Sequence, residues 1–428
     1  MKFFVRRDNQ GSNGNVVFEA DKNLLTGEQP FIRQFGGITS LEQDLLLLAS
    51  SIFAADRATP RGEGEDYSRA LELSVPIVNM ARLQPLARQV ERILRKLSND
   101  AWQIELRQEG GAPEQSLAIP PNHGKTLLFS GGLDSLAAAI DFGATPGGEL
   151  RLVSHITHNP QTTGAQKSLV GLLAGKGIVL PHAQFLVSSR ASAPAADLRH
   201  DIESSQRTRS FLFLVLAALA ARRAGNLEVL FIAENGQMAI HLPLTEGRIG
   251  ARSTHTAHPD VLSEMQKLLQ AALDLPIRIV NPYVDKTKAQ VIKPVWDGLP
   301  EAISISTSCW RSTRLPADAT HCGVCIPCYI RRIAIETYGT DPTAYARDPW
   351  REDLSQMAPQ DEARRNLADY AQFVLKIASS SEADLMVEWP ELYSPNLNPR
   401  STIQMYKRAA DETRQVWGRY PTLAALLV

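Results

Sequence analysis

Leu127-Leu-Phe-Ser-Gly-Gly-Leu-Asp-Ser-Leu-Ala-Ala-Ala-Ile140 is the stretch that decides the fold, because an apolar strand runs through a Gly-Gly turn into an alanine-rich helix. Backbone amides and hydroxyls at a helix N-terminus point toward an anion, and adjacent glycines allow its close approach. No lysine or arginine follows the glycines, so the turn is not the GxxxxGK[ST] loop of P-loop nucleotidases. It predicts a phosphate-binding loop, with an ordinary strand-to-helix turn as the alternative. The turn residues are Ser130, Gly131, Gly132, Leu133, Asp134 and Ser135.

Apolar strands and helices alternate along the chain after this stretch. Strands are expected at residues 126–129, 150–156, 184–187 and 227–232, and helices at 134–142, 163–174, 202–224 and 259–273. Such alternation, with continuous apolar runs as strands, predicts an α/β fold with a doubly wound parallel sheet covered by helices on both faces. Ligands of such sheets bind beyond the carboxyl ends of the strands, which is where the 130–135 loop falls.

All four cysteines of the chain fall within one short window, with the spacing C-x12-C-x2-C-x2-C. Thiolates at these spacings can converge in a tetrahedron, so the cluster favours a zinc site over disulfides. Two pairs of buried free cysteines are the alternative. The four residues are Cys309, Cys322, Cys325 and Cys328.

The two motifs together resemble a known family. Ser-Gly-Gly-Leu-Asp-Ser at 130–135 resembles the SGGxDS loop of the ATP pyrophosphatase (PP-loop) superfamily, whose members cleave ATP between the α and β phosphates. The segment from Cys309 to Arg331 is similar to the zinc motif of QueC, the 7-cyano-7-deazaguanine synthase. The resemblance covers roughly residues 124–340. It implies the adenine nucleotide alpha hydrolase-like fold, with ATP, magnesium (Mg2+) and structural zinc (Zn2+).

The resemblance also implies a reaction and residues for it. A 7-carboxy-7-deazaguanine-type carboxylate is adenylated and then passed to an amine, which in QueC is ammonia, and a second ATP converts the amide to the nitrile. Magnesium would bridge the phosphates near Asp134. The expected catalytic residues are Asp134, Ser135, Arg207 and Lys286. The expected nucleotide site consists of the 130–135 loop and His155. For His155, a role as a neutral hydrogen-bonding residue is the alternative.

Two basic stretches support these assignments. Ser205-Gln-Arg-Thr-Arg209 opens the long helix, and either arginine could hold a phosphate or carboxylate with its planar guanidinium, or lie on the surface. Asp285 is expected to cap a helix with Lys286 and Lys288 in its first turn. Cations there oppose the helix dipole, which an anion such as the ATP phosphates would relieve.

A long connection rich in glycine and arginine follows the fourth strand, at residues 233–258. Ordered loops of such length at strand ends usually serve a site. By the resemblance it corresponds to the substrate loop of QueC. Its candidate base-reading residues are Glu234, Asn235, Arg248, Arg252 and His255. After it, residues 304–309 are expected to form a short strand that enters the cysteine cluster.

The expected domains are an N-terminal α+β accessory domain at 1–115, a PP-loop domain at 124–300, a four-cysteine zinc lobe at 301–340 and a helical region at 341–428. QueC-like proteins with such flanking regions resemble those of bacterial anti-phage systems, notably QatC. This predicts a defence role in which the acceptor amine is the N-terminus of a partner protein from the same operon, similar to QatB. A 7-cyano-7-deazaguanine synthase that uses ammonia and a non-catalytic nucleotide-binding scaffold are the alternatives.

Composition limits the other possibilities. The chain has 428 residues, 44% of them hydrophobic, and a formal net charge of -1. This near-neutral balance argues against a general nucleic-acid surface. The sequence has no signal-peptide core and no run of about 18 apolar residues. We therefore expect a soluble cytoplasmic protein without membrane contact or direct nucleic-acid binding.

Overall fold

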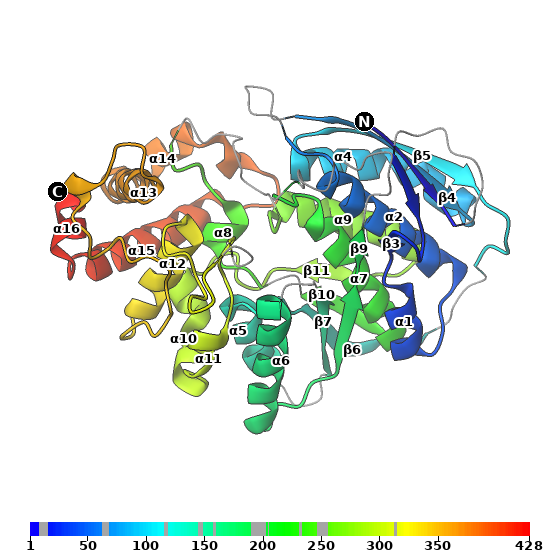
Figure 1. Cartoon of the computed structure of the whole chain (residues 1–428), viewed down its shortest axis with the longest axis horizontal. Coiled ribbons are helices and arrows are strands. Elements are labelled where there is room, and N and C mark those ends of the chain that lie inside the picture. Colours follow the sequence, from blue (N-terminus) through cyan, green and yellow to red (C-terminus); the bar gives the residue numbers. More distant parts are fainter. Residues whose placement is uncertain are drawn as a thin grey trace.

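The computed structural model describes the chain except for residues 8–15, 62–67, 115–118, 144–148, 157–159, 190–202, 204, 231–232, 246–255 and 312–314. Figure 1 shows a central sheet, an N-terminal sheet on one side of it and a C-terminal group of helices on the other.

The central sheet is parallel and has the strand order β11-β10-β6-β7-β8. The chain starts in the middle at β6, adds strands on one side and then crosses to the other, so the sheet is doubly wound as predicted. The order reverses beside β6, and this is the place where ligands of such sheets bind. The three-residue strand β11 was not predicted. The strands are β6 (Asn122–Leu128), β7 (Leu150–Ile156), β8 (His182–Leu186), β10 (Asn226–Leu230) and β11 (Arg278–Val280).

Successive residues of the central strands enter two different apolar cores, because side chains alternate across a sheet. Leu127 and Leu152 pack with one set of helices, whereas Leu128 and Val153 pack with the other. On the first face lie α5 (Leu133–Gly143), α6 (Pro160–Gly175) and α10 (Lys288–Gly298). On the second lie α7 (Arg209–Ala224) and α9 (Pro259–Leu273).

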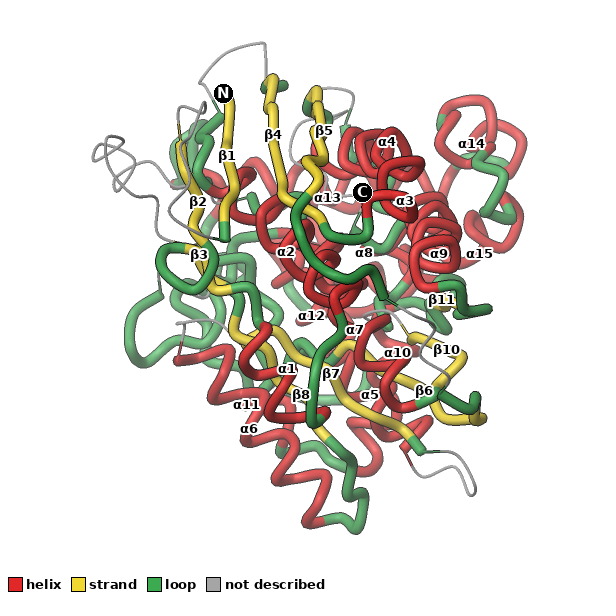
Figure 2. The backbone as a smooth tube through the Cα atoms, turned by 90° about the vertical axis from the view of Figure 1, so that its right-hand side faces the viewer, coloured by secondary structure: helices red, strands yellow, loops and turns green. Residues whose placement is uncertain are grey.

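The N-terminal sheet shares a core with the central one. Its parallel strands run in the order β2-β1-β4-β5, and Figure 2 shows α2 and α7 lying between the two sheets. Ile52 of α2 and Val215 of α7 belong to the same apolar cluster. The elements are β1 (Lys2–Arg6), β2 (Val16–Glu19), β4 (Ala70–Ile77), β5 (Ala101–Gln108), α2 (Ser40–Arg57) and α4 (Ala87–Ser98).

Short elements join these parts. Strand β3 (Leu24–Leu25) pairs antiparallel with β9 (Ser188–Ser189), and α1 (Glu28–Phe35) packs on β8. The chain between the two sheets is anchored at Glu114, because its carboxylate accepts a hydrogen bond from Nη1 of Arg222 at 3.2 Å. The N-terminal sheet is therefore fixed to the central one by packing and by a buried ion pair.

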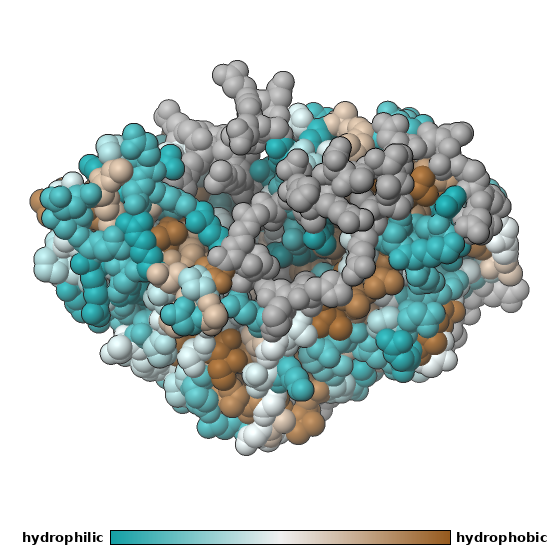
Figure 3. All heavy atoms as spheres, viewed as in Figure 1, coloured by the Kyte–Doolittle hydropathy of each residue, from teal (hydrophilic) through white to brown (hydrophobic). Residues whose placement is uncertain are grey.

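The C-terminal region is helical, as predicted. Its core is rich in aromatic residues, with Trp350 and Trp417 fully buried, and Figure 3 shows a largely hydrophilic outer surface over these helices. No helix in the described parts of the chain is both long and apolar enough to cross a bilayer. The helices are α12 (Ile326–Glu336), α13 (Glu362–Ser379), α14 (Glu382–Glu388), α15 (Pro399–Trp417) and α16 (Pro421–Ala424).

The strand expected at 304–309 is wrong. A single helical turn, α11 (Ala302–Ile305), occupies its first residues, and the chain then continues without regular structure to Cys309. A run as short as Ser304-Ile-Ser does not distinguish a strand from a helical turn by its pattern. Here the hydroxyl of Ser306 donates to the carbonyl oxygen of Ile303 at 3.0 Å and closes the turn.

Candidate active site

The 130–135 loop lies between the end of β6 and the start of α5, where the sequence predicts it. Gly131 has a φ of 84°, and a Cβ atom there would come within 3.2 Å of the side chain of Gln166. The Oγ atom of Ser130 accepts the N–H of Gly132 at 3.3 Å, and Oγ of Ser135 donates to the carbonyl oxygen of Gly132 at 3.0 Å. The two hydroxyls lie 3.3 Å apart. The loop therefore has a fixed shape at the N-terminus of α5, with the side chain of Leu133 buried beneath it.

Asp134 is the anchored carboxylate of this site. Its Oδ1 accepts from Nζ of Lys288 at 2.5 Å, and its Oδ2 accepts from Nδ2 and N–H of Asn235 at 2.9 and 3.3 Å. All three side chains are buried. Asn235 in turn caps α8 (Gly236–Ile240), because its Oδ1 accepts the N–H of Met238. Residues from three distant parts of the sequence thus meet at one carboxylate.

The start of α10 differs from the expectation. Thr287, and not Asp285, is the N-cap, and it forms a capping box with Gln290. Lys288 is therefore the first helical residue and turns toward Asp134. Lys286 is exposed, with its Nζ 4.8 Å from the ring centroid of Tyr283. The lysine that contacts the carboxylate of Asp134 is therefore Lys288, whereas the sequence predicted Lys286 as the catalytic lysine.

Glu234 is a second carboxyl group at the same site. Burial and the neighbouring charge of Asp134 raise the pKa of Glu234 to about 7, although Lys288 and Arg209 act in the opposite direction. One carboxylate is thus held by a lysine while the other exchanges protons near neutral pH, which is the property expected of a general acid or base. The other expected base-reading residues, Arg248, Arg252 and His255, lie outside the described residues.

The helix expected at 202–224 begins only at Arg209, so Arg207 precedes it, and the two arginines face different surroundings. The charge of Arg209 acts on Glu234, and its guanidinium lies 5.6 Å from the ring centroid of Phe213. Arg207 is 3% exposed and donates from Nη1 to the carbonyl oxygen of Ser98 at 3.3 Å. Arg207 therefore contacts the N-terminal part of the chain, while Arg209 is the arginine near the candidate site.

His155 is held as a neutral ring. Burial lowers the pKa of His155 to about 4, and its Nε2 lies 3.0 Å from the carbonyl oxygen of Val187. The ring packs between Phe53 and Phe213, with centroid distances of 5.7 and 5.4 Å. These contacts fit the hydrogen-bonding alternative for the imidazole.

The side chain of Gln166 connects the backbone of His155 with the backbone of the loop. Its Nε2 donates to the carbonyl oxygens of Ser130 and His155, both at 3.4 Å. Gln166 is 2% exposed and supports the loop from α6. A glutamine in the middle of a helix gives no sequence signal for this role, because only the packing of α6 against β6 and β7 brings it to the loop.

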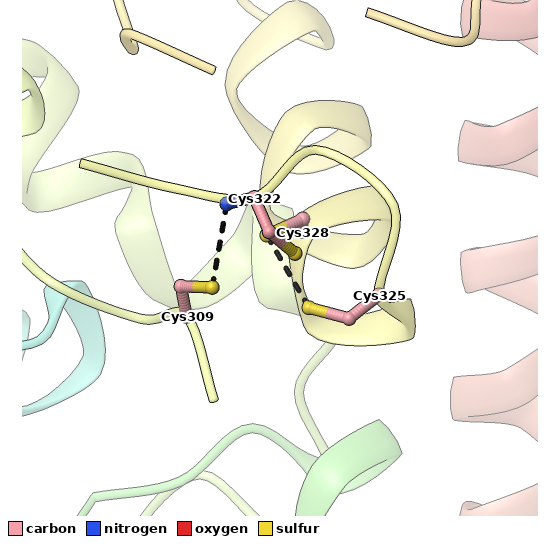
Figure 4. A group of neighbouring side chains, drawn as sticks. All are labelled: Cys309, Cys322, Cys325 and Cys328. Atoms are coloured by element: carbon pink, nitrogen blue, oxygen red, sulfur yellow. Dashed lines mark hydrogen bonds between the residues drawn. The ribbon is translucent and has the colours of Figure 1, made fainter. Parts of the chain in front are cut away.

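The four cysteines converge and are buried (Figure 4). Their Sγ atoms all lie within 4.8 Å of one another, with 3.4 Å between Cys325 and Cys328 and 3.8 Å between Cys322 and Cys328. Zn–S bonds of about 2.3 Å would place tetrahedral sulfurs about 3.8 Å apart, so the cluster fits zinc. Four thiolates fill the coordination sphere of the metal. The zinc that fits here is therefore structural.

The cysteine cluster is joined to the 130–135 loop by a short segment. The N–H of Thr307 donates to the carbonyl oxygen of Gly131 at 3.0 Å. Arg331 is fully buried and donates to the hydroxyls of Ser306 and Ser308 at 3.1 and 3.2 Å. Arg331 of α12 therefore holds the segment between the loop and Cys309 by these hydrogen bonds. Among the other arginines near the cluster, Arg332 pairs with Glu336 and Asp348, Arg311 pairs with Glu362, and Arg314 lies outside the described residues.

Comparison with known proteins supports the resemblance in part. Residues 212–339 match the family model described as "Queuosine biosynthesis protein QueC". No curated protein and no solved structure gives a significant match. The matched region runs from α7 to the end of α12 and leaves the 130–135 loop outside. The chain therefore contains a QueC-like region, and within it lie Glu234, Asn235, Lys288 and the four cysteines.

Proposed function

We propose that this protein is an ATP-dependent PP-loop enzyme of the QueC type, which activates a 7-carboxy-7-deazaguanine-type carboxylate as its adenylate. The observation that carries the proposal is Asp134, held by Lys288 and Asn235 at the start of a helix that follows a Ser-Gly-Gly turn. The QueC match at residues 212–339 supports both the use of ATP and the substrate class.

Activation is needed because a carboxylate does not react with an amine at neutral pH. In the proposed first step, a carboxylate oxygen of the substrate attacks the α-phosphorus of ATP, and the bond from that phosphorus to the bridging oxygen of the β-phosphate breaks. Pyrophosphate leaves. The N–H groups and hydroxyls of the 130–135 loop bind the leaving group, and the nearby charge of Lys288 stabilises its negative charge.

Asp134 also fits as a magnesium ligand. A carboxylate has about four lone-pair sites, and Lys288 and Asn235 use three of them, so room for one hard cation remains. Magnesium neutralises phosphate charge in such reactions.

In the proposed second step, an amine attacks the carbonyl carbon of the adenylate and AMP leaves. Glu234 can accept the proton that the attacking nitrogen loses, because its pKa of about 7 lies near the working pH. We propose that the amine is the N-terminus of a partner protein encoded by the same defence operon, similar to QatB. The N-terminal sheet and the C-terminal helices support this assignment, since an enzyme that acts on free ammonia needs no additional surface.

The first experiment measures AMP release from ATP with 7-carboxy-7-deazaguanine, for the wild-type protein and Asp134→Asn. AMP release that depends on the acid and is lost in the variant supports the activation step. Binding of ATP without any AMP would indicate a scaffold instead. A second experiment adds the protein encoded next to this gene and determines the mass of its N-terminal peptide. Formation of free nitrile with an unmodified peptide would assign the ammonia-dependent reaction.

A further inference from the structure

A cavity lies where α4 of the N-terminal part and residues 390–394 of the C-terminal region meet the central part of the chain. It has a volume of about 530 Å3. The end of α4 forms one wall, Arg207 and the start of α9 form another, and residues 390–394 of the C-terminal region close the third. No single part of the chain could form this cavity alone.

Arg207 gives the cavity a buried positive charge. The side chain is 3% exposed, its one described hydrogen bond goes to the carbonyl oxygen of Ser98, and its Nε has no partner among the described residues. Asp100, Glu203 and Asp56 act on this guanidinium from a distance, but no described carboxylate forms an ion pair with it, so its remaining N–H donors are available to an anion in the cavity.

The carboxylates nearest to Arg207 are engaged elsewhere. Asp100 accepts both terminal nitrogens of Arg61, at 2.8 and 2.6 Å, and Asp56 accepts the N–H and hydroxyl of Thr208 at 3.0 and 2.9 Å. Glu203 accepts the backbone N–H groups of Arg61 and Ser205 at 3.0 and 2.8 Å. These bonds occupy the carboxylates and leave Arg207 without an ion pair among the described residues.

Further side chains on the cavity walls indicate what kind of ligand fits. Arg95 and Lys96 add two exposed cations from the last turn of α4. On the C-terminal wall, Oε2 of Glu391 is buried and has no partner among the described residues, so it needs a hydrogen-bond donor. Tyr393 also lines this wall; the residue is 63% exposed, and its ring offers a flat apolar surface.

We propose that this cavity is a nucleotide-binding site, distinct from the 130–135 loop. The phosphate lies toward Arg207, Arg95 and Lys96, because a guanidinium binds phosphate oxygens in a planar, bidentate manner. An N–H or O–H of the base or ribose donates to Glu391. The base packs on Tyr393, and a cavity of this size accommodates one nucleoside monophosphate. The site is independent of the adenylation proposed above.

The test is calorimetric titration of the full-length protein with GMP, AMP and inorganic phosphate. We use the Asp134→Asn background, in which the proposed adenylation is lost, and assign to the cavity only the binding that the cavity variants change. The double variant Arg95→Ala/Lys96→Ala should weaken GMP or AMP binding about tenfold. The matched control is Arg88→Ala/Arg92→Ala, which removes the same charge from exposed positions of the same helix outside the cavity and should leave binding unchanged.

Two further variants separate the contacts. Arg207→Lys, which keeps the charge but not the planar donors, should weaken both nucleotide and phosphate. Glu391→Gln should weaken the nucleotide and leave phosphate unchanged. Equal losses in the two double variants would show non-specific attraction and overturn the proposal, as would the absence of nucleotide binding in the Asp134→Asn protein. If a short oligonucleotide bound more tightly than either monophosphate, the ligand of the cavity would be the end of a nucleic acid, and the proposal of a free nucleotide would be wrong.

Discussion

Nζ of Lys288 donates to Oδ1 of Asp134 at 2.5 Å, and the two residues are 154 positions apart in the sequence. Both side chains are more than nine-tenths buried. Removing a lysine and an aspartate from water costs free energy that their attraction alone often does not restore. The pair is therefore weak support for stability. If the 130–135 loop binds phosphate as proposed, the buried lysine is better explained by a third, anionic group that shares its charge.

The first prediction concerns this lysine. Lys288→Gln should lower the rate of AMP formation about a hundredfold, because a preorganised charge at the leaving group is lost. Lys286→Gln should have the smaller effect, since Lys286 is exposed over Tyr283. Lys293→Gln, which changes a surface residue of the same helix, is the control. A larger loss in Lys286→Gln than in Lys288→Gln would assign catalysis to Lys286.

The second prediction concerns the metal. We expect one zinc per chain, measured by elemental analysis of the purified protein. A strong chelator should remove it, make four thiols reactive and lower the melting temperature. AMP formation should fall in parallel, because Thr307 joins the cysteine segment to the carbonyl of Gly131. Activity that survives complete removal of zinc would show that the loop does not depend on this lobe.

The sequence predicted the parts of the site that have local spacing. The Ser-Gly-Gly turn and the four cysteines each lie within one short segment, so their spacing alone predicts which residues come together. Gln166 supports the loop from a helix whose position is set by tertiary packing, which no spacing reveals. Arg331 belongs to the cysteine motif, but its contacts with Ser306 and Ser308 are likewise set by packing. The offset between Lys286 and Lys288 was readable, because Thr287-Lys-Ala-Gln290 is a capping box that fixes where the helix begins.

The third prediction concerns the C-terminal helix α15, which supports both elements that hold Asp134. The hydroxyl of Tyr406 accepts the N–H of Leu242 at 3.1 Å, just after α8. The hydroxyl of Thr287 donates to Glu412 at 2.6 Å. Tyr406→Phe leaves the buried N–H of Leu242 unpaired, so the free energy of unfolding should fall by about 1–3 kcal/mol.

Urea unfolding checks this value, with Tyr393→Phe as the control because Tyr393 is exposed. An equal effect of the two substitutions would mean that the Tyr406 hydroxyl contributes nothing to stability. If α15 positions the site, Tyr406→Phe should also slow AMP formation at temperatures where the protein remains folded.

The last prediction concerns pH. The pKa of Glu234 is raised from 4.5 to about 7 in the folded protein, so its contribution to stability is fully present below about pH 4.5 and is lost as the pH rises through 7. Glu234→Gln abolishes this loss. Relative to the wild-type protein, the variant should therefore gain up to about 3 kcal/mol of unfolding free energy between pH 5 and pH 8. Urea unfolding at the two pH values measures the gain, and Glu301→Gln, at an exposed position, should show none. Parallel curves for the wild-type protein and Glu234→Gln would mean that folding does not raise the pKa of Glu234, and its carboxylate would then be only a weak base toward the amine at neutral pH.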